Sequence, residues 1–211
     1  PSSLTPGLRI GAVTRREDSR DALVNRWNRS LEELPVGARI GTGSPRRSVQ
    51  LLKLRPDLQV LPIRGNVPTR INKARGDEYD GVVVALAGLR RLALEDEAAQ
   101  VFQLDAMVPA HAQGALAVEV RDHDHNLDAL LLPIQDTETT TAVTAERMVL
   151  ARLGAGCRAP FGAHAYASGD MLILTAMLGD ETGEKVFRVT STGNASNPES
   201  VGEDAFRQLV E

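Results

Sequence analysis

The chain has 211 residues, which is enough for one large domain or two small ones around a buried core. Its 42% hydrophobic and 25% charged residues are typical of a soluble globular protein. No apolar run approaches the roughly 18 residues that a bilayer span requires, and no secretory signal opens the chain. The single cysteine excludes an intramolecular disulfide and favours a reducing compartment, so we expect a cytoplasmic protein without a membrane anchor.

The net charge of −4 hides an uneven distribution. Residues 39–92 contain eleven Lys and Arg against four acids, a balance of +7 that leaves −11 for the rest of the chain. A basic segment in an acidic protein indicates a local anion site and not a nucleic-acid-binding surface. The alternative is a charged face that water alone solvates.

Apolar runs rich in β-branched residues alternate with helical patterns along the chain, which predicts an α/β fold. Ser44 and Pro45 are typical of a helix start, and Gly154 is typical of a helix end. The expected strands are 8–13, 38–43, 59–65, 81–88, 114–120, 171–178 and 186–192. The expected helices are 45–54, 67–75, 88–94, 124–132, 137–153 and 199–211.

Two units are expected from the order of these elements. A basic βαβα unit covers residues 20–108, and a second unit from residue 137 to 211 has a helix, a pair of strands and a terminal helix. Segments 1–19 and 109–132 flank the first unit. They suit a chain that leaves one domain, builds a second and then returns.

The stretch 41-GTGSPRRS-48 takes a strand into a helix, and backbone N–H groups at a helix start bind anions. Arg46 and Arg47 lie in the first turn, where positive charge opposes the helix dipole unless an anion is bound. The stretch matches neither a Walker P-loop nor GxGxxG. The alternative is an ordinary strand–turn–helix with two exposed arginines.

Two further strands are followed by arginines, in 64-RGNVPTR-70 and 88-GLRRL-92. Ligands of open α/β sheets bind beyond the carboxyl ends of the strands. Because the arginine fork matches carboxylate and phosphate geometry, three such strand ends predict a ligand with several acidic groups. The 3% aromatic content makes a base-stacking surface for nucleic acid a poor alternative.

Cys157 follows a helix and lies among glycines and a proline in 153-LGAGCRAPFG-162. Three interpretations are open: an inert thiol, a covalent attachment point, and a nucleophile with His164 as its base. His123 and His125 form an i, i+2 pair in a polar turn, and we predict no metal site.

Six stretches, in order along nearly the whole chain, carry a resemblance: REDSRDA, GTGSPRRS, LRPDLQVLPIRGNVPTR, EYDGVVVALAGLRRL, AQGALAVEVR and AERMVLARLGAGCRAPFGAHA. Together they resemble the porphobilinogen deaminase family, also called hydroxymethylbilane synthases. The resemblance implies a transferase that joins four porphobilinogen units head to tail with loss of ammonia, on the route to haem and other tetrapyrroles. It also implies a dipyrromethane cofactor, bound to Cys157 through a thioether.

The implied fold is a periplasmic-binding-protein-like pair of domains across a cleft, plus an α+β domain that carries the cysteine. In that fold, residues 1–19 and 109–132 are the remnant of an incomplete first domain, 20–108 form the second and 137–211 the third. The resemblance assigns cofactor binding to Thr42, Ser44, Arg46, Arg47 and Arg70. It assigns substrate binding to Arg64, Arg70, Arg91 and Gln113.

The chain departs from the family pattern in two places. The family's catalytic aspartate precedes a proline that resembles Pro1, so we expect no catalytic residue in this chain and no turnover by the chain alone. The expected partner is a missing N-terminal segment of the same enzyme, in a complete protein that is monomeric. The second departure is Ala112, which stands where the family has glycine before Gln113. The alternative function is a periplasmic-type binding protein for a polycarboxylate ligand, which would need no cysteine loop.

Overall fold

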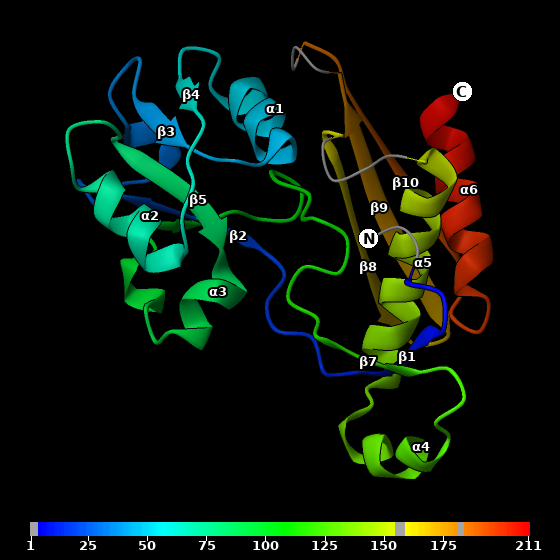
Figure 1. Ribbon diagram of the computed structural model, residues 1–211. Helices are drawn as coiled ribbons and strands as arrows, with labels where there is room; N and C mark the ends of the chain where they lie inside the picture. Colours follow the sequence, from blue (N-terminus) through cyan, green and yellow to red (C-terminus); the bar gives the residue numbers. More distant parts are fainter. Residues whose placement is uncertain (1–3, 155–158, 181–183) are drawn as a thin grey trace.

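The protein is described from a computed structural model that places residues 4–154, 159–180 and 184–211. It is a mixed α/β structure, as the sequence predicts, and its described residues form three separate sheets. Figure 1 shows the largest sheet and its helices on one side, a three-stranded sheet with two long helices on the other, and crossing segments between them. In the described part of the chain, every helix is too short or too polar to cross a membrane.

The largest sheet has five strands in the order β4-β3-β5-β2-β6. β3 pairs in parallel with β4 and β5, whereas β2 pairs antiparallel with β5 and β6. The three parallel strands therefore end at the same edge of the sheet. The bounds are β2 (Asp21–Asn25), β3 (Arg39–Gly41), β4 (Gln59–Leu61), β5 (Gly81–Ala85) and β6 (Gln100–Val101).

Helices cover both faces of this sheet, so residues of one strand alternate between two hydrophobic clusters. Leu23 of β2 packs in a cluster with Leu51 of α1, and its neighbours Ala22 and Val24 pack in another with Leu89 of α3. The helices are α1 (Pro45–Leu54), α2 (Val67–Ala74) and α3 (Leu86–Arg91). Because helices pack on both faces of this sheet, its strands and the ends from which the next segments leave are held in fixed positions.

The smallest sheet pairs β1 (Leu8–Val13) antiparallel with β7 (Ala117–Arg121), and α4 (Asn126–Leu131) packs beside it. Gly11 makes this packing possible, because a Cβ there would lie 2.8 Å from the Cδ1 atom of Leu131. Only two strands form this sheet in the described chain.

The third sheet is an antiparallel meander of β8 (Phe161–Ser168), β9 (Met171–Gly179) and β10 (Val186–Asn194). Helices α5 (Thr137–Leu153) and α6 (Pro198–Val210) pack together on one face of it (Figure 1). Asp136 caps α5 by accepting a hydrogen bond from the Thr139 backbone N–H, and Gly154 ends the helix with φ of 58°.

One prediction about the strands is wrong, and two further strands were missed. The sequence predicts a strand pair after residue 153, but β8 makes the sheet three-stranded. β8 has alanine at alternate positions, and its strand conformation depends on pairing with β9 and not on propensity. β2 was not among the expected strands, yet all five of its residues are buried. β6 has only two residues and carries no periodic signal.

Candidate functional site

The predicted arginines gather near one edge of the five-stranded sheet. β4, β3 and β5 are parallel neighbours, and each is followed by a segment that carries arginine. Arg46 and Arg47 begin α1 after β3, while Arg64 and Arg70 follow β4, and Arg91 ends the helix after β5. Arg64 and Arg91 are exposed and Arg70 is half-buried.

Arg46 and Arg47 are buried, with 3% and 8% of their surfaces exposed, so the interpretation as exposed arginines is wrong. Their partner is Asp21 at the start of β2, which is fully buried. Arg46 Nη1 donates to Asp21 Oδ2 at 2.7 Å. Arg47 Nε and Nη2 both donate to Asp21 Oδ1, at 3.0 and 2.7 Å. The anion expected beside these arginines is therefore supplied, in part, by the protein itself.

The three buried groups retain one net positive charge. Burial alone would raise the pKa of Asp21, but the nearby guanidiniums of Arg47 and Arg46 hold that pKa at about 2. Asp21 is consequently ionised at neutral pH, and two cations share one carboxylate. Burial, followed by the charge of Arg47, lowers the pKa of Arg70, which places a third cation near the pair.

Backbone oxygens fix the arginine pair further. Arg46 Nη1 also donates to Val108 O at 2.6 Å, and Arg47 Nη1 donates to Val83 O at 3.0 Å. Arg46 Nε is buried and, among the residues that the structure places, has no hydrogen-bond partner. A buried donor without a partner is costly, so this nitrogen is suited to an acceptor brought by a ligand.

Gln113 belongs to the same cluster. Its amide nitrogen donates to Ser19 O at 2.6 Å and to Asp21 Oδ1 at 2.9 Å, and its oxygen accepts from Arg46 Nη2 at 3.4 Å. The resemblance assigned Gln113 to substrate binding, but sequence reasoning missed Asp21, which lies 25 residues before Arg46. The two crossing segments that carry Ser19 and Gln113 thus meet at the arginine pair.

A second buried ion pair joins these crossing segments to the third sheet. Arg16 Nη1 donates to Glu146 Oε1 of α5 at 2.6 Å, and Arg16 Nε donates to Gln113 O at 2.8 Å. Glu146 also accepts from the Ala112 and Ala165 backbone N–H groups, at 2.6 and 2.7 Å. Burial raises the pKa of Glu146 against the opposing charge of Arg16. We call these five residues the junction.

Ala112 has a φ of 57°, which is the left-handed conformation that glycine adopts more easily. The departure noted in the sequence therefore falls on a strained backbone position. Ala112→Gly should raise the free energy of unfolding by about 1 kcal/mol, because relief of this strain outweighs the greater flexibility of unfolded glycine. Urea denaturation of both proteins measures the change. A lower stability of the variant would contradict the assigned strain.

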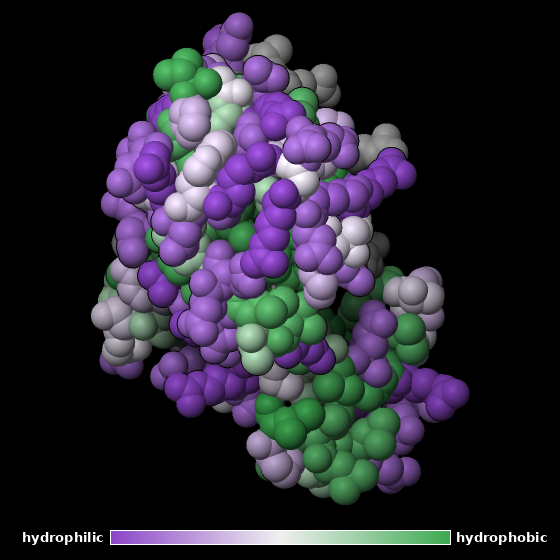
Figure 2. All heavy atoms as spheres, turned by 90° about the vertical axis from the view of Figure 1, so that its left-hand side faces the viewer, coloured by the Kyte–Doolittle hydropathy of each residue, from purple (hydrophilic) through white to green (hydrophobic). Residues whose placement is uncertain are grey.

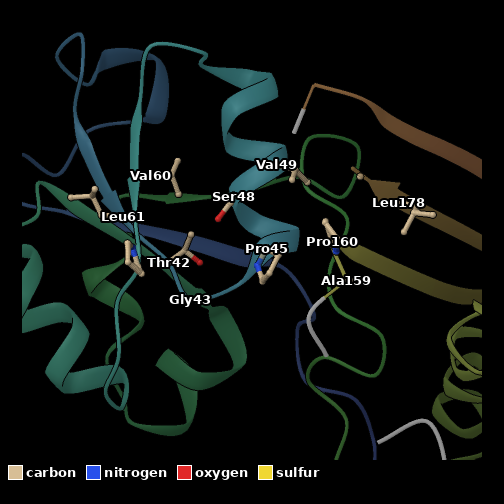
Figure 3. A pocket seen from close by; sticks show the side chains of 12 residues that line it. Thr42, Gly43, Pro45, Ser48, Val49, Val60, Leu61, Ala159, Pro160 and Leu178 are labelled. Atoms are coloured by element: carbon tan, nitrogen blue, oxygen red, sulfur yellow. The ribbon is translucent and has the colours of Figure 1, made fainter. Parts of the chain in front are cut away.

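A cavity of about 720 Å³ lies between the five-stranded sheet with its helix α1 and the three-stranded sheet. Figure 3 shows Thr42, Gly43 and Ser48 on one wall, with Ala159 and Pro160 on the opposite wall. The lining of the cavity is mostly apolar, and its apolar residues include Val49, Val60, Leu61 and Leu178. A ligand with flat apolar rings and polar substituents fits such a lining.

Polar groups beside the cavity come from the turn that enters α1. The Thr42 hydroxyl oxygen accepts from Ser44 N at 3.1 Å, and the Ser44 side chain makes no capping hydrogen bond. A Cβ at Gly43 would lie 3.0 Å from Ile63 O, so glycine permits the close approach of these two chain segments. Arg70 Nε donates to Gly65 O at 2.7 Å, which turns its guanidinium back toward the end of β4.

Gly162 explains how the cysteine-bearing segment approaches the arginine pair. A Cβ on this residue would lie 2.8 Å from Pro109 O and 3.0 Å from Arg46 Cδ. β8 can therefore pass directly over the Arg46 side chain only because residue 162 has none. Cys157 itself lies outside the described residues.

Arg91 lines a second cavity of about 450 Å³. Arg90 and Glu17 also line it and form an ion pair, with Arg90 Nη1 at 2.7 Å from Glu17 Oε1. Glu17 thus has a partner that its sequence context did not reveal. In this second cavity, the exposed and positively charged Arg91 lies next to the Arg90–Glu17 ion pair, whose charges cancel.

The histidines have minor roles in this arrangement. Burial lowers the pKa of His164 to about 4, which makes it a weak base for any nucleophile. His125 contacts Asp128, with 3.3 Å between Nδ1 and Oδ2. Within the described ranges, no group of three metal-binding side chains is present.

Family comparisons match the two parts of the chain separately. A model described as "Porphobilinogen deaminase, dipyromethane cofactor binding domain" matches residues 1–129. A model described as "Porphobilinogen deaminase, C-terminal domain" matches residues 140–211. The chain belongs to the porphobilinogen deaminase family.

Curated members of the porphobilinogen deaminase family are similar along the whole chain. The proteins of Roseiflexus castenholzii and Geobacillus kaustophilus are each 44% identical to it, over 211 and 212 residues. These alignments cover 100% of this chain and 69% and 68% of those proteins. The protein of Acidothermus cellulolyticus is 45% identical, with 100% of this chain and 65% of that protein covered. The chain thus spans about two thirds of the length of these relatives.

Solved structures add little. A YaeC-family lipoprotein of Enterococcus faecalis matches 61% of this chain and 62% of its own, at 13% identity and a TM-score of 0.42. That likeness is too low to assign the fold.

Proposed function

We propose that this chain carries the pyrrole-carboxylate site and the cofactor anchor of a hydroxymethylbilane synthase. The reaction joins four porphobilinogen units head to tail with release of ammonia, in tetrapyrrole and haem biosynthesis. Each pyrrole carries an acetate and a propionate, so the growing chain is a polycarboxylate. The observation that supports this function best is the edge of parallel strands where Arg46, Arg47 and Arg70 lie near one another with one carboxylate between them.

The residues present fit a dipyrromethane cofactor. Arg46 Nε is a buried donor with no partner among the placed residues. Thr42 and Ser48, which carry hydroxyl groups, line the mostly apolar cavity together with Pro45, the residue before Arg46. Bound dipyrromethane would supply the primer to which the first substrate is joined. We assign its covalent attachment to Cys157 and the binding of its carboxylates to the residues that the resemblance names: Thr42, Ser44, Arg46, Arg47 and Arg70.

The place of Cys157 in the sequence, two residues before a cavity-lining residue, supports this assignment. Cys157 precedes Ala159 by two residues, and two residues of chain span at most about 7 Å. Ala159 and Pro160 line the cavity wall opposite Thr42. A thiol on this segment is therefore within reach of a group bound in the cavity.

Arg64, Arg70, Arg91 and Gln113 are assigned to the incoming substrate and the lengthening product. Arg64 and Arg91 are exposed, which leaves their guanidiniums accessible to carboxylates from solvent. Gln113 differs from them, because its amide is already bonded to Asp21 and Ser19. Its contribution would be made through those neighbours.

The domain assignment is also part of the proposal. Residues 20–108 would form one domain of a periplasmic-binding-protein-like cleft and 137–211 the α+β domain, while 1–19 and 109–132 would belong to the other cleft domain. The apolar surface of α4 supports this, since Leu130 and Leu132 are 72% and 71% exposed beside a sheet of two strands. Figure 2 shows apolar side chains gathered in this lower region, below a largely hydrophilic face. Exposed leucines next to an unfinished sheet suit coverage by the remaining part of a family-length protein. A cytoplasmic, monomeric complete enzyme is proposed on the family's pattern.

Intact mass spectrometry under denaturing conditions tests the function. The chain purified with its natural partner segment should carry the added mass of two linked pyrroles, and Cys157→Ser should show the bare sequence mass. Ser168→Ala, at an exposed position of β8, serves as the matched control and should keep the adduct. A bare mass together with a thiol that reacts fully with a thiol reagent would favour a polycarboxylate-binding protein instead.

A further inference from the structure

Asp21 has no role in the function proposed above, yet it lies at the centre of the arginine cluster. It is the first residue of β2, an interior strand of the five-stranded sheet, and none of its surface is exposed. A carboxylate in such a place must be compensated by several donors. It receives donors from three side chains: Arg46, Arg47 and Gln113.

The two carboxylate oxygens divide these donors. Oδ2 accepts from Arg46 Nη1, whereas Oδ1 accepts from Arg47 Nε and Nη2 and from the Gln113 amide. Arg47 is thereby held through two nitrogens, which fixes the plane of its guanidinium. Arg46 makes only one hydrogen bond to the carboxylate, while its Nη2 donates to Gln113 Oε1 at 3.4 Å and its Nε remains without a partner among the placed residues.

Asp21 also keeps two like charges together. Adjacent buried guanidiniums repel each other, and the pKa of Arg46 is lowered by burial and further by Arg47. With the carboxylate present, the repulsion is offset while one positive charge is left over for a ligand. Without the carboxylate, each arginine would gain by turning away from the other.

Gln113 holds the Asp21 carboxylate in place from a different part of the chain. Its side-chain amide nitrogen donates to Asp21 Oδ1 and Ser19 O, and its backbone carbonyl oxygen accepts from Arg16 Nε of the junction. The direction of the Asp21 carboxylate therefore depends on a segment 92 residues away.

We propose that Asp21 is a positioning residue, which presents Arg46 and Arg47 to pyrrole carboxylates, and that Gln113 acts on binding through Asp21. The inference rests on the proposed function, because the carboxylates that Arg46 and Arg47 bind are those of the dipyrromethane cofactor. Its pyrroles carry the same acetate and propionate groups as porphobilinogen, so porphobilinogen serves as the probe of this site in the chain without its cofactor. It gives Asp21 no contact with the ligand. Its effect is on the placement of the two guanidiniums.

Calorimetric titration of porphobilinogen into the full chain tests the inference. Asp21→Asn preserves shape but removes the charge, and it should weaken binding about tenfold or more. Asp80→Asn is the control, because Asp80 pairs with Arg39 at 2.9 Å at the opposite end of β3. Asp80→Asn should lower the thermal unfolding midpoint without changing the affinity. Equal affinities of Asp21→Asn and the wild-type chain would overturn the inference.

A double-mutant cycle separates bracing from direct contact. Gln113→Leu should weaken binding in the wild-type background, but it should add nothing to Asp21→Asn if Gln113 acts through Asp21. Additive losses would contradict that part of the inference. If Asp21→Asn does not fold, Gln113→Leu is measured alone. An unchanged affinity for porphobilinogen would contradict the proposed action of Gln113 on Asp21, and a reduced affinity would support it. A wild-type chain that binds no porphobilinogen would instead contradict the proposed function, and this inference with it.

Discussion

Glu146→Gln will lower the free energy of unfolding by about 3–5 kcal/mol, as expected when one partner of a buried ion pair is removed. Glu146 is fully buried and accepts from Arg16 and from the Ala112 and Ala165 backbone N–H groups. Glutamine keeps the size of the side chain, but its NH₂ group would face one of these donors. The buried Arg16 charge would also lose its partner. Urea denaturation followed by circular dichroism measures the loss.

The exposed pair Arg75–Glu97 provides the control for this prediction. The Arg75 side chain is 57% exposed, and exposed pairs contribute about 0–1 kcal/mol. Glu97→Gln should therefore change the stability little. A similar loss of stability in both variants would mean that the junction holds the crossing segments to α5 no more strongly than an exposed ion pair would.

Gly114→Ala will also lower the free energy of unfolding by about 3 kcal/mol or more, through two separate effects. Gly114 has a φ of 85°, which an alanine adopts only under strain. In addition, a Cβ at this position would lie 2.4 Å from Glu17 O. The clash would separate the crossing segments at the point where Glu17 N donates to Gly114 O at 2.9 Å.

Gly7 isolates the second effect. Its φ is 83°, nearly the same as that of Gly114, but a Cβ there would meet no atom within 4 Å. Gly7→Ala should therefore show the backbone strain alone, about 1–2 kcal/mol. Equal losses at Gly7 and Gly114, again measured by urea denaturation, would show that the contact with Glu17 is absorbed by a small shift. A larger loss of stability at Gly114 would show that close packing of the two crossing segments is needed to hold the fold together around the site.

The helices could be read from the sequence with little error. The predicted ranges 45–54 and 137–153 coincide with α1 and α5, because capping residues and apolar periodicity are local properties. The strands were less predictable. β8 has alanine at alternate positions and β2 begins with an aspartate, so pairing with neighbouring strands decides both.

The sequence by itself determined the α/β class, the arginines after three strands and the resemblance to one family, since each depends on residues close together in the chain. Only the tertiary structure decided which groups those arginines meet. Asp21 lies beside Arg46 and Arg47, and Arg16 lies beside Glu146, 130 residues away. These pairings are long-range, and buried charges must find partners wherever the fold brings them. That requirement makes Arg46 and Arg47 a buried pair with a carboxylate of its own.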